Sequence, residues 1–150
     1  MISHKIKICG LIFFGVLVFI APFVYFKNYS IYGNRLENIS INNHKIKAEV
    51  VESNKKIAKG LSNREKMCGN CGMLFKFLQK EKYPFWMKGM KFNLDMVWID
   101  GENIMYIAKN VPYNFQDTII PNAPADKVLE INAGMADRYG IKIGDSIELD

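Results

Sequence analysis

The sequence predicts a small, mainly β domain with two or three short helices, folded as a barrel or sandwich and preceded by one N-terminal transmembrane helix. One observation is an uninterrupted apolar run from Ile8 to Phe26 that contains no charged residue. Another is that short β-rich or alternating segments, separated by Gly, Pro, Asn and Asp, recur along the rest of the chain. Finally, residues 36–150 are numerous enough for one domain with its own core.

The apolar run is long enough to cross a bilayer. As a helix, residues 8–26 would span about 28 Å, close to the roughly 30 Å hydrocarbon core. Lys5 and Lys7 precede the run and Lys27 follows it, which favours a cytoplasmic tail, residues 1–7. No A-x-A-like site ends the run, so an uncleaved anchor is favoured over a signal peptide. We therefore expect a single-pass membrane protein whose domain lies outside the cytoplasm.

The net charge argues against nucleic acid as a partner. The formal charge is +5, and the three lysines beside the anchor account for most of it, which leaves +2 for the remainder. We expect those three lysines to lie beside the anionic headgroups of a membrane. The other basic residues are scattered and form no block interleaved with aromatic residues.

The first elements after the anchor are a linker and a hairpin. Residues 27–35 are polar and predict a linker that separates the domain from the bilayer. Leu36–Ile41 alternates apolar and polar residues, as a half-buried strand does, and Ile46–Val51 predicts its partner. Asn42-Asn43 between them is suited to a turn.

Short helices and a strand are predicted next. Ser53 is positioned to cap a helix that runs through Leu61. Ser62 and Glu65 have the spacing of a capping box, which predicts a further helical turn ending near Met67. The apolar segment Met73–Phe77 is expected to be a strand.

A second hairpin and a long loop follow. Met96–Ile99 and Ile104–Ala108 are β-rich and flank an Asp-Gly pair, a strong hairpin pattern. Three prolines interrupt the segment Val111–Asp126, which predicts a loop.

The C-terminal part predicts a strand, a helix and a strand. Lys127–Ile131 is β-rich, and Asn132 is positioned to cap a short helix over Ala133–Tyr139. Gly140 would end that helix, and Ser146–Leu149 is expected to be the last strand.

Cys68 and Cys71 form a C-x-x-C pair with three interpretations. A structural disulfide is favoured, because the predicted compartment is oxidising. A redox-active pair is less favoured, because the thiols follow a predicted helix end, where the helix dipole disfavours a thiolate. A zinc site needs four ligands, and the domain adds only His44 to the two thiols. We expect no metal and no cofactor.

The segment Phe85–Lys88 is the best candidate surface. Alternation predicts that Phe85 and Met87 point into the core, whereas Trp86 and Lys88 point to the other face. Trp provides a large contact area, and Lys adds a charge that can hold an anionic group. Trp86 and Lys88 are therefore candidate binding residues.

Asp95 and Glu130 are carboxylates within apolar strands, where an unpaired charge is costly. Arg64 is a candidate partner for one of them. Two carboxylates in one cleft can perform acid–base hydrolysis, but no third catalytic group accompanies them. The favoured role is structural, in which they accept backbone N–H bonds or lie on a solvated face.

Six short blocks, in this order, resemble the domain-of-unknown-function 192 family: Ala58–Leu61 with Arg64, Gly72–Phe75, Phe85–Lys88, Leu94-Asp95, Val128–Gly134, and Gly140-Ile141 through Gly144-Asp145. The resemblance covers roughly Val50–Ile147 and implies a compact, mainly β, barrel-like domain. It implies no established reaction, cofactor or partner. The chain departs from the family pattern at Gly89-Met90, which replace Asn-Thr, and at Cys68-Gly69-Asn70-Cys71, which is not part of that pattern.

Two functional hypotheses remain open. The favoured one is a non-enzymatic binding module, held at a membrane by residues 8–26, that recognises a protein or small molecule through Trp86, Lys88 and the Val111–Asp126 loop. The alternative is an enzyme: a hydrolase that uses Asp95 and Glu130, or a thiol-disulfide protein that uses Cys68 and Cys71.

Overall fold

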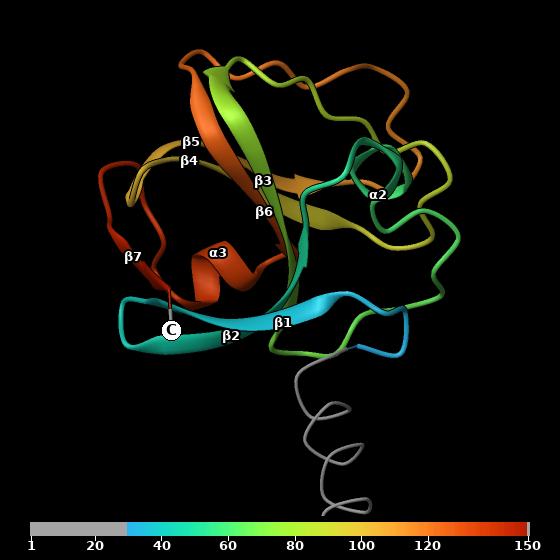
Figure 1. The fold of residues 1–150 in the computed structure, drawn as a ribbon, viewed down its shortest axis with the longest axis horizontal. Helices are drawn as coiled ribbons and strands as arrows, with labels where there is room; N and C mark the ends of the chain where they lie inside the picture. Colours follow the sequence, from blue (N-terminus) through green and yellow to red (C-terminus); the bar gives the residue numbers. More distant parts are fainter. Residues whose placement is uncertain (1–29, 150) are drawn as a thin grey trace, which may run out of the picture.

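The computed structural model describes residues 30–149, which form one curled, seven-stranded sheet with two small helices (Figure 1). The strand order is β5-β4-β6-β3-β2-β1-β7. The elements are β1 (Arg35–Ile41), β2 (His44–Val51), α2 (Asn54–Lys59), β3 (Cys71–Glu81), β4 (Leu94–Asp100), β5 (Asn103–Val111), β6 (Ala125–Asn132), α3 (Met135–Arg138) and β7 (Ile147–Leu149). The predicted mainly β fold is therefore correct, and its architecture is a half-barrel.

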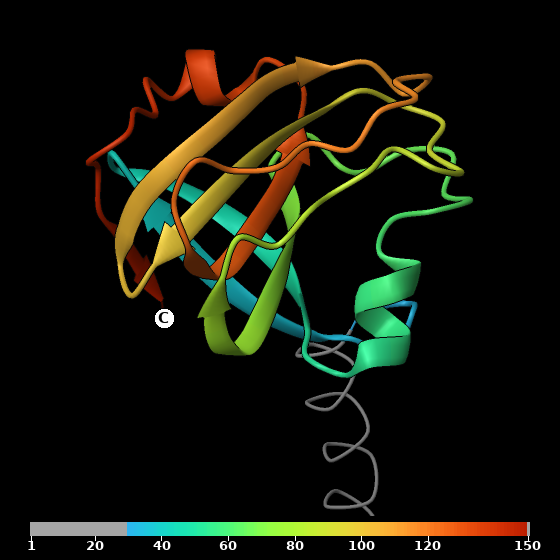
Figure 2. The same cartoon turned by 90° about the horizontal axis from the view of Figure 1, so that it is seen from above.

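One pair of neighbouring strands is parallel, and this pair creates the crossover that matters most for the site. β2 and β3 pair in parallel from Lys47↔Cys71 to Val51↔Phe75, whereas the other neighbouring strands pair antiparallel. Parallel neighbours require a long connection, and residues 52–70 supply it, with α2 at its start. Figure 2 shows α2 standing to one side of the sheet.

The central strands are buried on both faces, which explains their almost continuous apolar sequence. In β4, Leu94, Met96 and Trp98 pack into one core, whereas Val97 and Ile99 pack into the other. The first core, which includes Met73, Phe75 and Phe85, lies on the side of α2 and the residue 83–92 segment. The second lies inside the curl of the sheet, against α3. The sheet thus separates two apolar cores.

The two edges of the sheet approach each other at one end. The Ile104 N–H donates to the Asp145 carbonyl at 2.9 Å, and the Ile147 N–H donates to the Glu102 carbonyl at 2.8 Å. These bonds join the β4–β5 turn and the start of β5 to Asp145 and to the first residue of β7. Pairing of otherwise free edge groups protects the sheet from adding further strands.

Three local predictions are wrong. The helical turn predicted from Ser62 to Met67 is absent: residues 60–63 form turns and residues 64–67 are not helical, and the Ser62 hydroxyl donates to the Lys88 carbonyl (2.9 Å) instead of capping. The preceding helix ends at Lys59 and not at Leu61. The last helix begins after Gly134, whose φ of +82° suits glycine, and the Asn132 side chain donates to the Cys68 carbonyl.

The predicted membrane anchor, residues 8–26, lies outside the described residues. Within residues 30–149, neither helix has the length and apolar character needed to cross a bilayer.

Candidate functional site

The Tyr83–Met90 segment has the alternation that its sequence predicts. Phe85 and Met87 are buried, whereas Trp86 is 49% exposed and Lys88 is exposed. Phe85 is held in place because its backbone exchanges hydrogen bonds with Ile119 (3.0 and 2.8 Å). The core therefore takes alternate residues of the segment and presents the Trp86 side chain to solvent.

A groove of about 540 Å³ lies between this segment, α2 and β3. Its wall is mostly apolar, with the side chains of Ile57, Phe75, Phe77, Tyr83, Phe85 and Trp86. The rings of Phe77 and Tyr83 stack, and Phe75 meets Phe85 edge to face, so much of the wall is packed before any ligand binds. We call this feature the α2 groove.

The α2 groove exists because α2 contributes no buried residue to the core. Ile57 is only partly buried, and Ala58 lines the groove beside it. A helix usually buries its apolar stripe against a sheet. Here the crossover holds α2 away from β3, and apolar surface on both remains accessible.

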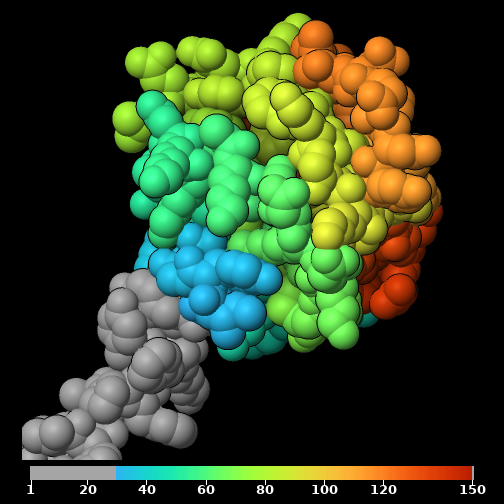
Figure 3. All heavy atoms as spheres, turned by 90° about the vertical axis from the view of Figure 1, so that its right-hand side faces the viewer, coloured from blue at the N-terminus to red at the C-terminus, as the bar shows by residue number. Residues whose placement is uncertain are grey.

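Trp86 also borders a second hollow, of about 950 Å³. This loop hollow is lined by Trp86, Lys88, Tyr113, Phe115, Gln116 and Thr118, among others. The structure thus brings Trp86 and Lys88 together with part of the Val111–Asp126 loop, as the sequence predicts. Figure 3 shows α2, the residue 83–92 segment and this loop on one face of the molecule.

Glu130 lines the α2 groove at the sheet. Its cross-strand partners are Met73 in β3 and Met96 in β4, both members of the core on that face. The residue is 4% exposed, and within residues 30–149 its Oε2 atom has no hydrogen-bond partner. Burial raises the pKa of its carboxyl to about 8, although the positive charge of Arg64 acts to lower it. The carboxyl group is therefore mainly protonated at neutral pH.

Arg64 forms its ion pair with neither predicted carboxylate, although its charge acts on Glu130. Its guanidinium binds both oxygens of Glu49, at 2.5 and 3.0 Å, and lies 3.7 Å from the centre of the Tyr32 ring. Burial raises the pKa of Glu49, but hydrogen bonds from Arg64 and Asn34 outweigh it and hold that pKa below its ordinary value. Arg64 thus ties the start of the domain, through Tyr32 and Glu49, to the crossover.

Asp95 has a structural role. It is fully buried, and its two oxygens accept the backbone N–H groups of Asn110 (2.7 Å) and Ala136 (2.8 Å). These bonds fasten the end of β5 and the start of α3 to β4. The interpretation of Asp95 as an acceptor of backbone bonds is confirmed.

Asp95 and Glu130 do not form a two-carboxylate site. Asp95 is opposite Ile131 in the β4–β6 ladder, whereas Glu130 is opposite Met96, one residue further along. Adjacent positions of a ladder point to opposite faces of a sheet, so the two carboxyl groups face different cores. The hydrolase hypothesis that used both of them is wrong.

Cys68 and Cys71 are joined by a disulfide in the turn before β3. The Cys71 N–H donates to the Cys68 carbonyl (3.1 Å), and the Asn70 carbonyl accepts from the Lys47 N–H (2.9 Å). The cross-link therefore lies where the parallel β2–β3 pairing begins. Neither cysteine lines the α2 groove.

The sequence pointed to Trp86 and Glu130 separately but did not reveal the α2 groove between them. Its walls come from α2, β3 and the Tyr83–Met90 segment, which only the fold brings together. One weak sign was present: Ile57 and Ala58 are the only apolar residues of α2, too few to cover a sheet.

Comparison with known proteins supports the fold. A family profile for DUF192, described as "Uncharacterized ACR", matches residues 37–149. A solved protein of unknown function from Novosphingobium aromaticivorans DSM 12444 is 29% identical, with a TM-score of 0.75; the match covers 80% of this chain and 89% of that chain. A Sinorhizobium meliloti 1021 protein, whose name proposes a transcription regulator, is also 29% identical, with a TM-score of 0.74 over 77% and 95% of the two chains. No curated protein matches the chain.

Proposed function

We propose that this chain, which belongs to the uncharacterised DUF192 family, is a non-enzymatic binding module that captures a small, largely apolar molecule in the α2 groove. The observation that carries the proposal is the groove itself: about 540 Å³, with an aromatic wall and Trp86 half-exposed at its border. Pockets of this size with few polar groups are typical of small-molecule sites.

The chemistry of the site favours binding over catalysis. Asp95 is already occupied by two backbone N–H groups, and it faces the other core. The disulfide lies outside the groove. Within residues 30–149, no cluster of three His, Cys, Asp or Glu side chains is arranged to hold a metal ion. The weak net charge beyond the anchor, +2, also favours an apolar ligand over nucleic acid.

The second part of the proposal is location. The apolar run of residues 8–26 would hold the domain at the outer side of a membrane. A groove for apolar molecules close to a bilayer has ready access to compounds that partition into lipid.

Trp86→Ala tests the groove. The probe is 6-propyl-2-dimethylaminonaphthalene, an apolar fluorophore without a carbonyl group. We expect the variant to bind the probe about tenfold more weakly, because truncation removes a large aromatic contact. Since Trp86 is largely outside the core, the variant should keep the circular dichroism and unfolding midpoint of the wild type.

Tyr113→Ala is the matched control. Tyr113 is 52% exposed, similar to Trp86, but it lines only the loop hollow. Its removal should leave probe affinity unchanged. Equal losses in both variants would assign the ligand to the loop hollow, and an absence of probe binding to the wild type would refute the proposal.

A further inference from the structure

The apolar α2 groove contains one buried polar group whose presence the fold does not explain. Glu130 is 4% exposed, and no group within residues 30–149 bonds to its Oε2 atom. Burying a polar group without a partner costs free energy, and such groups in native proteins usually have a function or a bound partner. Asp95, in the adjacent strand, shows that this fold can satisfy a buried carboxyl fully.

The register directs the Glu130 side chain toward the groove and away from the interior of the curl. Its strand neighbours Leu129 and Ile131 belong to the core inside the curl. Its cross-strand partners Met73 and Met96 belong to the core beneath the groove, and Glu130 itself lines the groove. The Glu130 side chain therefore borders the space that a ligand in the groove would occupy.

We propose that Glu130 is the recognition group of the α2 groove and donates a hydrogen bond from its carboxyl to an oxygen atom of the ligand. The ligand class is a neutral, largely apolar molecule that carries one carbonyl or similar acceptor oxygen. This inference rests on the proposed function, because it requires the groove to be a ligand site.

The protonation state of Glu130 supports this chemistry. Its pKa of about 8 means that the group holds a proton at neutral pH, and a neutral carboxylic acid has one O–H to donate. In ketosteroid isomerase, a carboxylic acid that an apolar site keeps neutral donates to a ligand oxygen in the same way.

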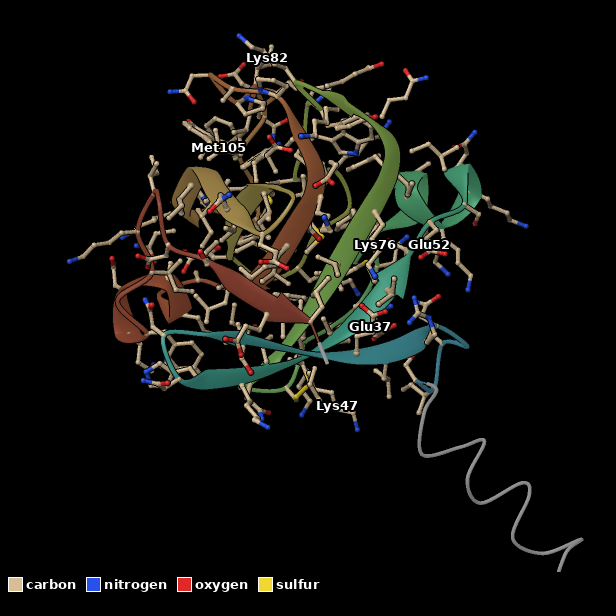
Figure 4. The ribbon with its side chains drawn as sticks, turned by 60° about the vertical axis from the view of Figure 1, so that its left-hand side comes forward. Glu37, Lys47, Glu52, Lys76, Lys82 and Met105 are labelled. Atoms are coloured by element: carbon tan, nitrogen blue, oxygen red, sulfur yellow. A yellow bond between two sulfur atoms is a disulfide. The ribbon has the colours of Figure 1, made fainter. Side chains whose placement is uncertain are left out.

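The surrounding charges favour a neutral ligand over a cation. Arg64 is the charge that acts on Glu130, and it is positive. Four other charged residues line the groove: Glu52, Lys59, Lys76 and Glu81. Two are acidic and two are basic, and Lys76 is paired with Glu37 at 2.9 Å. Figure 4 labels both of these side chains, which lie on β3 and β1. The groove therefore offers no net negative field that would attract a cation.

The test compares two probes that differ in one functional group. 6-Propionyl-2-dimethylaminonaphthalene has a ketone oxygen, whereas the 6-propyl analogue does not. We expect the wild-type protein to bind the ketone about 3- to 10-fold more tightly than the alkyl probe, the range of one hydrogen bond in a buried site. Emission of the bound ketone should be shifted to the red, because hydrogen bonding to its carbonyl lowers the energy of the excited state.

Two variants distinguish the effect of the hydrogen-bond donor from the effect of side-chain shape. Glu130→Leu removes the donor but keeps an apolar side chain, and a buried polar group replaced in this way seldom prevents folding. Glu130→Gln keeps a donor, the side-chain N–H₂. We expect Glu130→Leu to lose the ketone preference and the red shift while binding the alkyl probe at least as well as the wild type. Glu130→Gln should keep the preference.

The outcomes distinguish this inference from the proposed function. If neither probe binds, the groove is not a ligand site and both proposals fail. If both probes bind wild type and Glu130→Leu equally, the groove binds apolar molecules but Glu130 does not recognise them. If dodecyltrimethylammonium displaces the ketone probe more effectively than 2-dodecanone does, the carboxyl group is a receptor for cations and the inference is refuted.

Discussion

Glu130 and Asp95 lie on neighbouring strands, yet their carboxyl groups have opposite environments. Asp95 accepts two backbone N–H groups, one at each oxygen. Glu130 has an unbonded oxygen and a pKa raised to about 8 by burial. A shift of one position in the β4–β6 ladder separates the two faces. Asp95 therefore stabilises the fold. Burial of Glu130 destabilises it and leaves a polar group beside the groove.

Glu130 should make the stability of the domain depend on pH. The unfolded carboxyl loses its proton above its ordinary pKa of 4.5, whereas the folded one keeps it up to about 8. Between these values the folded state binds more protons, so the free energy of unfolding falls as pH rises, by about 1.4 kcal/mol per unit. Below about pH 4.5 the carboxyl group is protonated in both states, so Glu130 no longer lowers the free energy of unfolding through its ionisation.

The measurement is urea unfolding of wild type and Glu130→Gln at about pH 5 and about pH 7. The variant cannot titrate, so its stability relative to wild type should rise by roughly 2–3 kcal/mol over this interval. Taking the difference between the two proteins removes the contributions of Glu37 and Glu49. Their lowered pKa values oppose the trend, since that stabilisation is lost as pH falls. A constant difference would show that Glu130 is ionised in the folded protein.

At the level of elements, the β2–α2–β3 crossover determines where the site forms. Parallel pairing of β2 with β3 obliges residues 52–70 to pass across one face of the sheet, and α2 lies in this connection without burying a residue. Close approach of β3 to β6 also depends on Gly72, where a Cβ atom would lie 2.9 Å from the Glu130 carbonyl oxygen. The backbone of Glu130 is thus held firmly while the space above its side chain is left accessible.

The Cys68–Cys71 disulfide should stabilise the start of this pairing modestly. In the chain-entropy treatment of cross-links, closing a four-residue loop contributes about 2 kcal/mol. We expect the Cys68→Ser, Cys71→Ser double variant to lose about that much in urea unfolding and to bind the alkyl probe normally, because neither cysteine lines the groove. Unchanged stability of the double variant would contradict a structural role for the disulfide.

At the scale of the whole molecule, the proposed anchor would determine which ligands the groove meets. The two basic residues before the apolar run and the one after it favour a cytoplasmic N-terminus, which would place the groove outside. Ser30 and Asn34, within the predicted linker of residues 27–35, bond to Glu49, which Arg64 also binds, and Arg35 begins β1. The C-terminal part of the predicted linker is therefore packed against the domain.

Membrane fractionation tests this arrangement. The protein with residues 8–26 should stay in the membrane pellet after an alkaline carbonate wash, and a variant lacking residues 1–27 should move to the supernatant. Protease added outside intact cells should digest the domain and spare a cytoplasmic marker. Full protection of the domain in cells without a further barrier would reverse the proposed topology.

Much of the fold was predictable from local patterns. The seven strands were all anticipated, because alternation and paired turn residues are visible within a few positions of the chain. The wrong predictions also came from local patterns. Ser62 has the spacing of a helix cap, but its hydroxyl bonds to Lys88, which is distant in sequence. A capping pattern predicts a helix only when no tertiary acceptor competes for the same hydroxyl group.

The sequence by itself determined the β-rich class, the alternation that separates Trp86 from Phe85 and Met87, the position of Asp95 and Glu130 within apolar strands, and the proximity of the two cysteines. Those properties depend on alternation and on residues close in the chain. Only the tertiary structure decided that Arg64 pairs with Glu49, that the two carboxyl groups face different cores, and that a groove separates α2 from β3. Strand order, parallel pairing and register arise from contacts between distant segments, and a shift of one residue in register moves a side chain to the opposite face of the sheet.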